Sequence, residues 1–179
     1  MRKSNLLLII LLFVSALGSL GGASFSSVEG KLFNDKAFIF PDDLLEQGPV
    51  VVALTLSSSR KNGEEQQGLF IDWQKKLKAA FSPLRSVSIY HVSVIDGAPF
   101  FVRGAIRGGI AKEYGDILES SQGGVLFLSK SERWAADAAI PIDGQPTLVV
   151  LSENGSILGF VKGEYSEQRA EQLQTLLGL

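Results

Sequence analysis

Residues 140–163, IPIDGQPTLVVLSENGSILGFVKG, decide the fold. Two apolar runs, TLVVL (147–151) and ILGFV (157–161), flank the polar segment SENGS. Asn-Gly between apolar runs is the strongest short-range hairpin signal, because both residues tolerate a positive φ. Downstream, Ser166 is placed to cap a last helix. The apolar face of that helix consists of Ala170, Leu173, Leu176 and Leu177. The stretch therefore predicts a strand–turn–strand unit followed by a helix.

Upstream of the hairpin, apolar runs alternate with amphipathic segments. Residues 50–56 (VVVALTL) show no polar alternation, which indicates a strand buried on both faces. The other expected elements are a short helix at 41–49, a helix at 65–81, a strand at 87–95, a glycine-interrupted helix at 101–114, a strand at 125–128 and a short helix capped by Ser131. Right-handed crossovers place the central strands parallel, with helices on both faces and the hairpin at one side. The sequence thus predicts an α/β fold.

Composition excludes several classes of function. The chain has 179 residues, a net charge of −2, no cysteine and one histidine, His91. A near-neutral charge provides no basic patch for nucleic acid. The absence of cysteine excludes disulfides, thiol redox chemistry and thiolate metal sites. We expect no cofactor and no metal.

The N-terminus has the layout of an export signal. Arg2 and Lys3 precede the apolar run 6–20, and Gly21 and Ala23 offer small residues for cleavage after Ala23. We expect residues 1–23 to be a signal peptide or an N-terminal anchor and residues 24–179 to be a single domain. The apolar run is short against the roughly 20 residues of a membrane span. The expected location is periplasmic or otherwise extracytoplasmic, with membrane contact only through the N-terminal segment if it is uncleaved.

Several motifs together resemble the thioredoxin-like redoxins. They are GPVVV (48–52) at the first central strand, IPIDGQPTLVVL (140–151), and NGSI (154–157) before the last helix. The resemblance extends from about Phe40 to Leu177 and implies a three-layer α/β/α sandwich with a mixed central sheet. It also implies that Pro146 is the cis-proline that redoxins place beside their active site, with a cis bond to Gln145.

Two layouts within that superfamily resemble the chain. In peroxiredoxin-like redoxins, a strand like residues 126–129 precedes a short helix and an Ile-Pro run. In the mitochondrial ATP synthase assembly factors, a segment like residues 90–96 precedes an aromatic-basic helix, and an element like residues 151–157 follows late in the chain. This chain has Gly159 and Phe160 where those factors have an Arg-Trp pair.

Thioredoxins carry Cys-x-x-Cys between the first central strand and the next helix. The matching positions here are Ser57, Ser58, Ser59, Arg60 and Lys61. Thiolate is the nucleophile of that chemistry, and a serine hydroxyl does not replace it in disulfide exchange. The resemblance therefore implies a degenerate redox site without thiol–disulfide or peroxidase activity.

Three interpretations of this stretch remain open. A serine nucleophile needs a base, but no Gly-x-Ser-x-Gly motif is present and His91 lies mid-strand. An anion cradle at the helix start would use the serine hydroxyls with Arg60 and Lys61, although Glu64 and Glu65 compensate the same helix end. The third interpretation is a polar loop whose serines cap the next helix.

A basic-aromatic segment offers a second candidate surface. Arg103 and Arg107 lie four apart, after Phe100 and Phe101. This face would dock a partner or a membrane surface, unless the arginines simply cover a packed phenylalanine pair. We take Phe101, Arg103, Arg107 and Gln145 as the candidate partner-binding residues.

The sequence therefore favours a non-redox thioredoxin-like binding module that acts outside the cytosol as an assembly or chaperone-like factor with a protein partner. The alternative is a redoxin-derived enzyme or anion-binding protein that uses residues 57–61. The carboxylate pairs at 42–43 and 64–65 lack the spacing of a metal site, and we expect them to be helix-start charges.

Overall fold

The computed structural model describes residues 22–45, 49–57, 59–79 and 83–179. The export signal expected in residues 1–23 falls almost wholly outside this range. Within it, seven strands form one mixed sheet in the order β2-β1-β5-β4-β3-β6-β7. The strands are β1 Val28–Leu32, β2 Ala37–Phe40, β3 Val50–Leu56, β4 Ile89–Asp96, β5 Gly123–Leu128, β6 Thr147–Leu151 and β7 Ile157–Lys162. The α-helices are α1 Arg60–Ala79, α2 Phe100–Tyr114, α3 Ser131–Asp137 and α4 Glu167–Leu177.

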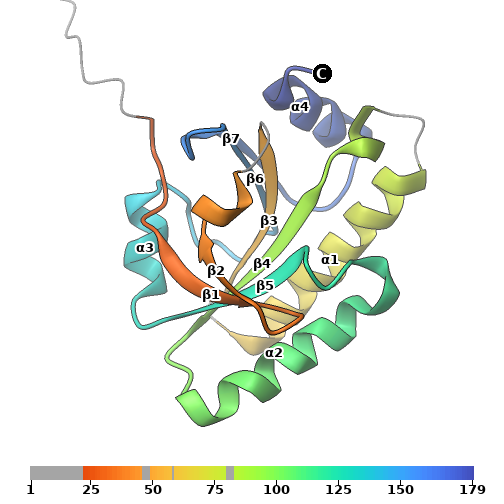
Figure 1. Ribbon diagram of the computed structural model, residues 1–179. Helices are drawn as coiled ribbons and strands as arrows, with labels where there is room; N and C mark the ends of the chain where they lie inside the picture. The colour runs from red at the N-terminus through yellow and green to blue at the C-terminus, as the bar shows by residue number, and fades with distance from the viewer. Residues whose placement is uncertain (1–21, 46–48, 58, 80–82) are drawn as a thin grey trace, which may run out of the picture.

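The central strands β3, β4 and β5 run parallel, as expected. The helices α1 and α2 connect them, and β6 then returns antiparallel beside β3 (Figure 1). The hairpin β6–β7 forms one end of the sheet. An antiparallel pair absent from our sequence expectation, β1–β2, forms the other end and joins the sheet through β5.

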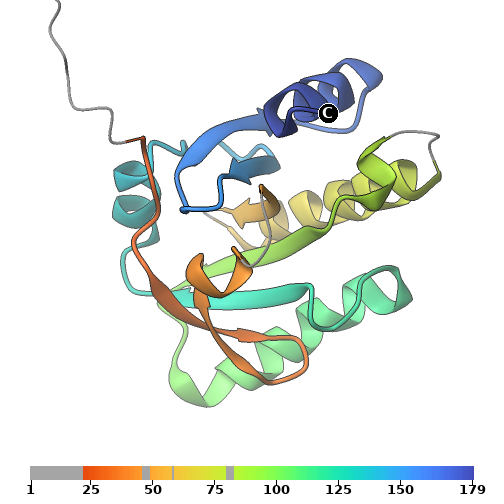
Figure 2. The same cartoon turned by 45° about the horizontal axis from the view of Figure 1, so that its top comes forward.

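Two apolar cores lie on opposite faces of the sheet. One core packs α1 and α4 against the sheet, through side chains such as Phe70, Trp73 and Leu173. The other packs α3 and the N-terminal segment, through Trp134 and Phe25, whose rings stack at 4.6 Å. Figure 2 shows α3 separated from α1 and α4 by the strands. Helices therefore cover both faces, and the predicted three-layer α/β arrangement is confirmed.

Some predicted boundaries are wrong for identifiable reasons. The first helix begins at Arg60 rather than at residue 65, because Asn62 and Gln66 form hydrogen bonds that fix its first turns. Ser131 is the first residue of α3 rather than its cap. Its backbone N–H and hydroxyl both donate to the Asp96 carboxylate, at 3.3 and 2.9 Å.

The expected short helix at 41–49 is a single 3-10 turn, Asp42–Leu44, and residues 46–48 lie outside the described range. The cap of the last helix is confirmed, since the Ser166 hydroxyl accepts from Arg169 N. No helix within the described residues is long and apolar enough to cross a membrane.

Candidate functional site at the carboxyl edge of the sheet

The carboxyl ends of parallel β3, β4 and β5 meet at one edge of the sheet. Helices α1, α2 and α3 all start at this edge (Figure 1). The loop before β6 reaches the same edge, because β6 runs antiparallel to β3. In α/β sheets, ligands bind outside the carboxyl ends of the strands. The degenerate redox positions and the Pro146 loop therefore both lie where a site is expected.

The serine segment is a helix start rather than an open nucleophile. The Ser59 hydroxyl accepts a hydrogen bond from Asn62 N at 3.3 Å, so Ser59 caps α1. Ser57 Oγ lies so close to Gly63 that a Cβ at residue 63 would be 3.0 Å from it. Ser58 lies outside the described residues. Ser59 therefore matches the helix-cap interpretation, and Ser57 packs against Gly63.

The two cations of the segment form ion pairs within α1. Arg60 Nε lies 2.7 Å from Glu64 Oε1, and Lys61 Nζ lies 3.8 Å from Glu65 Oε1. Hydrogen bonding to Glu64 raises the pKa of Arg60. Because each cation has a carboxylate one turn away, the helix start offers little net positive charge to an anion.

A buried amide network joins the helix start to β3 and to the loop before β6. The Gln66 side chain exchanges hydrogen bonds with both the N–H and the carbonyl of Leu56, at 3.2 and 2.8 Å. Gln66 also donates to Asn62 Oδ1 at 2.8 Å, and Asn62 Nδ2 donates to the Gly144 carbonyl at 3.0 Å. We did not identify Asn62 and Gln66 from the sequence. Their signal is the spacing 62, 66, 70, which places two amides on the apolar stripe of α1.

The loop before β6 corrects the cis-proline expectation. The cis peptide bond of the described residues joins Phe40 and Pro41, and the Gln145–Pro146 bond is trans. The chain turns instead at Asp143 and Gly144. The Asp143 carboxylate accepts from Gln145 N at 3.1 Å, and Gly144 adopts a φ of 78°. A turn made upstream of the proline leaves the lower-energy trans isomer in place.

The single histidine is a core residue of β4. The His91 ring is 2% exposed and contacts the rings of Phe70 and Tyr114 edge-on, with centroids 6.0 and 5.0 Å away. Its Nε2 lies 3.5 Å from Gln74 Oε1, and its Nδ1 has no partner among the described atoms. Burial lowers the pKa of His91 to about 3. We find no contact between His91 and the described serines, so it does not serve as their base.

At the start of α2, the two arginines form contacts with other parts of the chain and the two phenylalanines are exposed. This is the reverse of the alternative in which arginines cover a packed phenylalanine pair. Arg103 donates to the Ala98 carbonyl at 3.0 Å and lies 5.1 Å above the Phe127 ring. Arg107 forms an ion pair with Asp35 and is 14% exposed. Phe100 and Phe101 are 86% and 85% exposed. The candidate surface is therefore apolar at residues 100–101 rather than basic at 103 and 107.

The hydrogen-bond network thus connects the Gln145 loop with the start of α1. Among the described residues, we find no hydrogen bond, ion pair or ring contact between Phe100 or Phe101 and residues 57 and 59–61, although both groups lie at the same edge. Among the residues that the structure describes, no three His, Asp or Glu side chains are grouped to hold a metal ion.

Comparisons with known proteins identify the fold. No protein-family model and no curated protein sequence matches the chain. A member of the Sco family of cytochrome c oxidase assembly proteins superposes with a TM-score of 0.60 at 14% identity, covering 87% of this chain and 92% of that one. A putative electron transfer protein from Aquifex aeolicus gives 0.59 at 15% identity over 90% and 100%.

The thioredoxin domain of a thiol-disulfide oxidoreductase from Bacteroides vulgatus gives a TM-score of 0.52 at 14% identity, covering 89% of this chain and 99% of that one. At such identities the similarity establishes the fold alone. The chain has a thioredoxin-like fold, as its motifs predict. The resemblance to ATP synthase assembly factors stays a prediction.

Proposed function

We propose that this chain is a non-redox, thioredoxin-like binding module that acts as an assembly or chaperone-like factor outside the cytosol. We infer that residues 1–23 direct its export and that residues 24–179 act as one domain. The assembly role of the Sco-family protein named above agrees with this proposal, although the likeness itself concerns the fold.

The exposed phenylalanine pair is the single observation that carries the proposal. Phe100 and Phe101 are among the most exposed large apolar side chains of the described residues. Burying one phenylalanine side chain contributes about 1.5–3 kcal/mol. Two adjacent rings at the edge that carries the degenerate redox positions therefore offer a partner a compact apolar anchor.

An enzyme that uses the serine loop is the less favoured alternative. Ser59 already accepts a helix N–H, and Arg60 and Lys61 face Glu64 and Glu65. A serine nucleophile needs a base within hydrogen-bond reach, but His91 is buried under α1. An anion would have to compete with the Glu64 and Glu65 carboxylates for Arg60 and Lys61.

Copper chemistry does not fit the residues of this edge. The Arabidopsis thaliana ScoI structure, with a TM-score of 0.57 at 10% identity, contains bound copper. Soft sulfur ligands and imidazole are the usual copper ligands in proteins. Here the loop between β3 and α1 carries serine, arginine and lysine, the chain has no cysteine, and the one histidine lies in the core. The proposed function therefore does not involve copper.

Site-specific photocrosslinking in the native host tests the proposal. A photoreactive phenylalanine analogue at residue 101 should capture a defined protein partner. The same analogue at Lys112, exposed at the other end of α2, is the matched control and should capture none. Phe100→Ser with Phe101→Ser should abolish the complex without changing the urea midpoint, because both rings are exposed. Equal capture at residues 101 and 112 would refute the proposed surface.

Serine variants, compared with the double phenylalanine variant, test the alternative. If Ser57→Ala or Ser59→Ala removed a turnover that the phenylalanine variant retains, the protein would be an enzyme. Intact-mass analysis of the exported protein reports the N-terminus directly. The expected result is the mass of a chain that begins at Ser24.

A further inference from the structure

Strand β7 has one covered half and one open half. At its start, Ile157 N donates to the Ala23 carbonyl at 2.7 Å, and Ser24 forms an antiparallel bridge with Ser156. The chain's own residues 23 and 24 thus lie along the first part of the strand. Beyond Ile157, no other described strand pairs with this edge. The edge therefore already accepts an antiparallel extended segment over its first residues.

The ladder geometry shows which backbone groups are open. Gly163 N donates to the Pro146 carbonyl at 2.9 Å, and the neighbouring pair is Thr147 with Lys162. Antiparallel pairs alternate between bonded and non-bonded, so Val161 bonds to β6 whereas Phe160 and Lys162 present their N–H and C=O groups outward. A bulge at Leu158 reverses the alternation. This reversal explains why the backbone N–H of Ile157 also points away from β6, toward Ala23.

The opposite edge of the sheet is protected and β7 is not. On β2, the Ile39 N–H donates to the Asp43 carboxylate at 2.6 Å, so a carboxylate occupies the position that an added strand would need. Charged side chains commonly guard such edges. On β7 the Lys162 ammonium bonds to the Asp143 carboxylate instead of guarding the edge. Among the described residues, no charged side chain bonds to the outward peptide groups of Phe160 and Lys162, and the Arg169 guanidinium lies beside Gly163, just beyond the end of the strand.

An apolar hollow lies beside the open edge. It has a volume of about 620 Å³ and is lined by residues that include Ala136, Ile140, Ile142 and Phe160. Phe160 is 39% exposed, and the bulged Leu158 is 47% exposed. Because alternate side chains of a strand point to the same face, a segment added along β7 would place every second side chain over this hollow.

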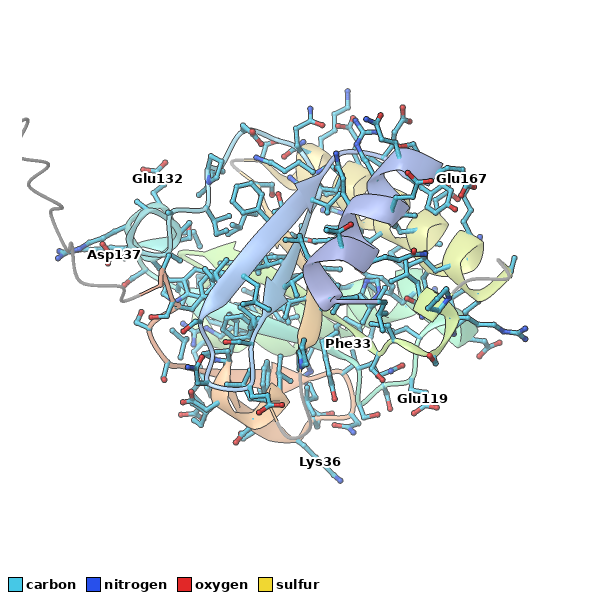
Figure 3. The ribbon with its side chains drawn as sticks, turned by 90° about the horizontal axis from the view of Figure 1, so that it is seen from above. Phe33, Lys36, Glu119, Glu132, Asp137 and Glu167 are labelled. Carbon is cyan, nitrogen blue, oxygen red and sulfur yellow. The ribbon has the colours of Figure 1, made fainter. Side chains whose placement is uncertain are left out.

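The surroundings of the edge are acidic. Figure 3 shows Glu132 and Asp137 on α3 to one side of β7 and Glu167 on α4 to the other. Glu171 adds a further carboxylate on α4. Arg133, a cation of α3, lies 4.0 Å from Asp137, and Arg169 of α4 donates to the Glu164 carbonyl. A complementary segment would carry basic residues at its ends.

We propose that the open half of β7 binds an extended peptide segment of a partner protein, which adds antiparallel to Phe160–Lys162, places apolar side chains in the hollow and carries flanking lysine or arginine. This surface is distinct from the Phe100–Phe101 edge and does not depend on it. Main-chain hydrogen bonds provide the affinity and the hollow provides the selectivity, as in other cases of strand addition.

A nuclear magnetic resonance titration with blocked synthetic peptides tests this site on the isotope-labelled exported protein. The probe is Lys-Thr-Val-Thr-Phe-Thr-Lys, and the comparison peptide replaces both lysines with glutamate. The probe should shift the amide signals of residues 158–163 and slow hydrogen exchange at Phe160 and Lys162, while Val161 is protected with or without it. The glutamate peptide should bind at least about tenfold more weakly.

Two matched variants distinguish the contribution of the hollow to peptide binding from a general effect of adding a leucine to a helix surface. Ala136→Leu fills the hollow from an exposed position on α3 and should weaken binding of the probe peptide at least about tenfold. Ala105→Leu makes the same change at an exposed position on α2 and should leave binding unchanged. The proposal is overturned if the probe does not bind, if its shifts lie elsewhere, or if both variants bind alike. Protection of Phe160 and Lys162 by concentration of the protein alone would also overturn it, because a second copy would then be the occupant.

Discussion

Replacing His91 by glutamine should remove a large acid-dependent loss of stability. Burial, with a smaller contribution from the charge of Lys78, lowers the pKa of His91 from 6.5 to about 3 in the folded state. The unfolded chain therefore binds a proton below about pH 6.5, whereas the folded chain binds it only near pH 3. Stability consequently falls as the pH falls through this window.

The size of the effect follows from the two pKa values. Between pH 7 and pH 5, protonation of His91 in the unfolded state should lower the free energy of unfolding by about 2 kcal/mol. The ring has no alternative way to accommodate the proton, because Phe70, Tyr114 and the Gln74 amide surround it. A protonated ring would be an unpaired charge in the core.

Urea unfolding of the native protein and His91→Gln near pH 7 and pH 5 measures this term. Carboxylates titrate alike in both proteins, so the difference between their two losses isolates the histidine. We expect the native protein to lose about 2 kcal/mol more than the variant. Equal losses would show that residue 91 is protonated while folded, and the description of a neutral buried ring would be wrong.

Other substitutions test the remaining contacts by urea unfolding. Asn62→Ala should cost about 1–3 kcal/mol by breaking the link between α1 and the loop before β6, whereas Lys61→Ala, at an exposed ion pair, should change stability by less than about 0.5 kcal/mol. Ser166→Ala should cost about 1 kcal/mol through loss of the α4 cap, and rescue by Ser166→Asp would confirm capping. Gly123→Ala should destabilise by about 1–3 kcal/mol, because its Cβ would lie 2.0 Å from the Phe33 ring. Gly108→Ala, with open space around it, should stabilise by about 0.5–1 kcal/mol, and the opposite order would refute the close approach of Phe33 to β5.

The elements that could be predicted are those whose signal is local. The apolar run of β3 and the turn between β6 and β7 can each be predicted from a few consecutive residues. The turn is confirmed, with Gly155 at a φ of 79°. The strand pair β1–β2 was not predicted, because its stability depends on a partner strand that is distant in the sequence. Gly30 lies opposite Leu126, almost a hundred residues away along the chain, and no local pattern encodes that contact.

The candidate site was predictable in position but not in detail. The redoxin-like motifs predict that residues 57–61 and Pro146 share one edge; the structure has residues 57, 59–61 and Pro146 there, and their role as a site stays a prediction. The trans bond at Pro146 and the exposed phenylalanines were missed, since both depend on how neighbouring loops turn. The amides Asn62 and Gln66 were missed because polar residues on a helix usually face solvent, and burial becomes visible only when their partners on other elements are known.

The hydrogen bond between Ile157 and Ala23 has a consequence for the timing of maturation. If a signal peptidase cuts after Ala23, as the sequence predicts, the Ala23 carbonyl departs with the leader and the Ile157 N–H loses its partner. The accessible edge of β7 then lengthens toward its beginning, and a new α-ammonium group appears at Ser24. The precursor would thus keep part of this edge shielded, and the same cut that releases the protein from its leader would make the full edge available only after export.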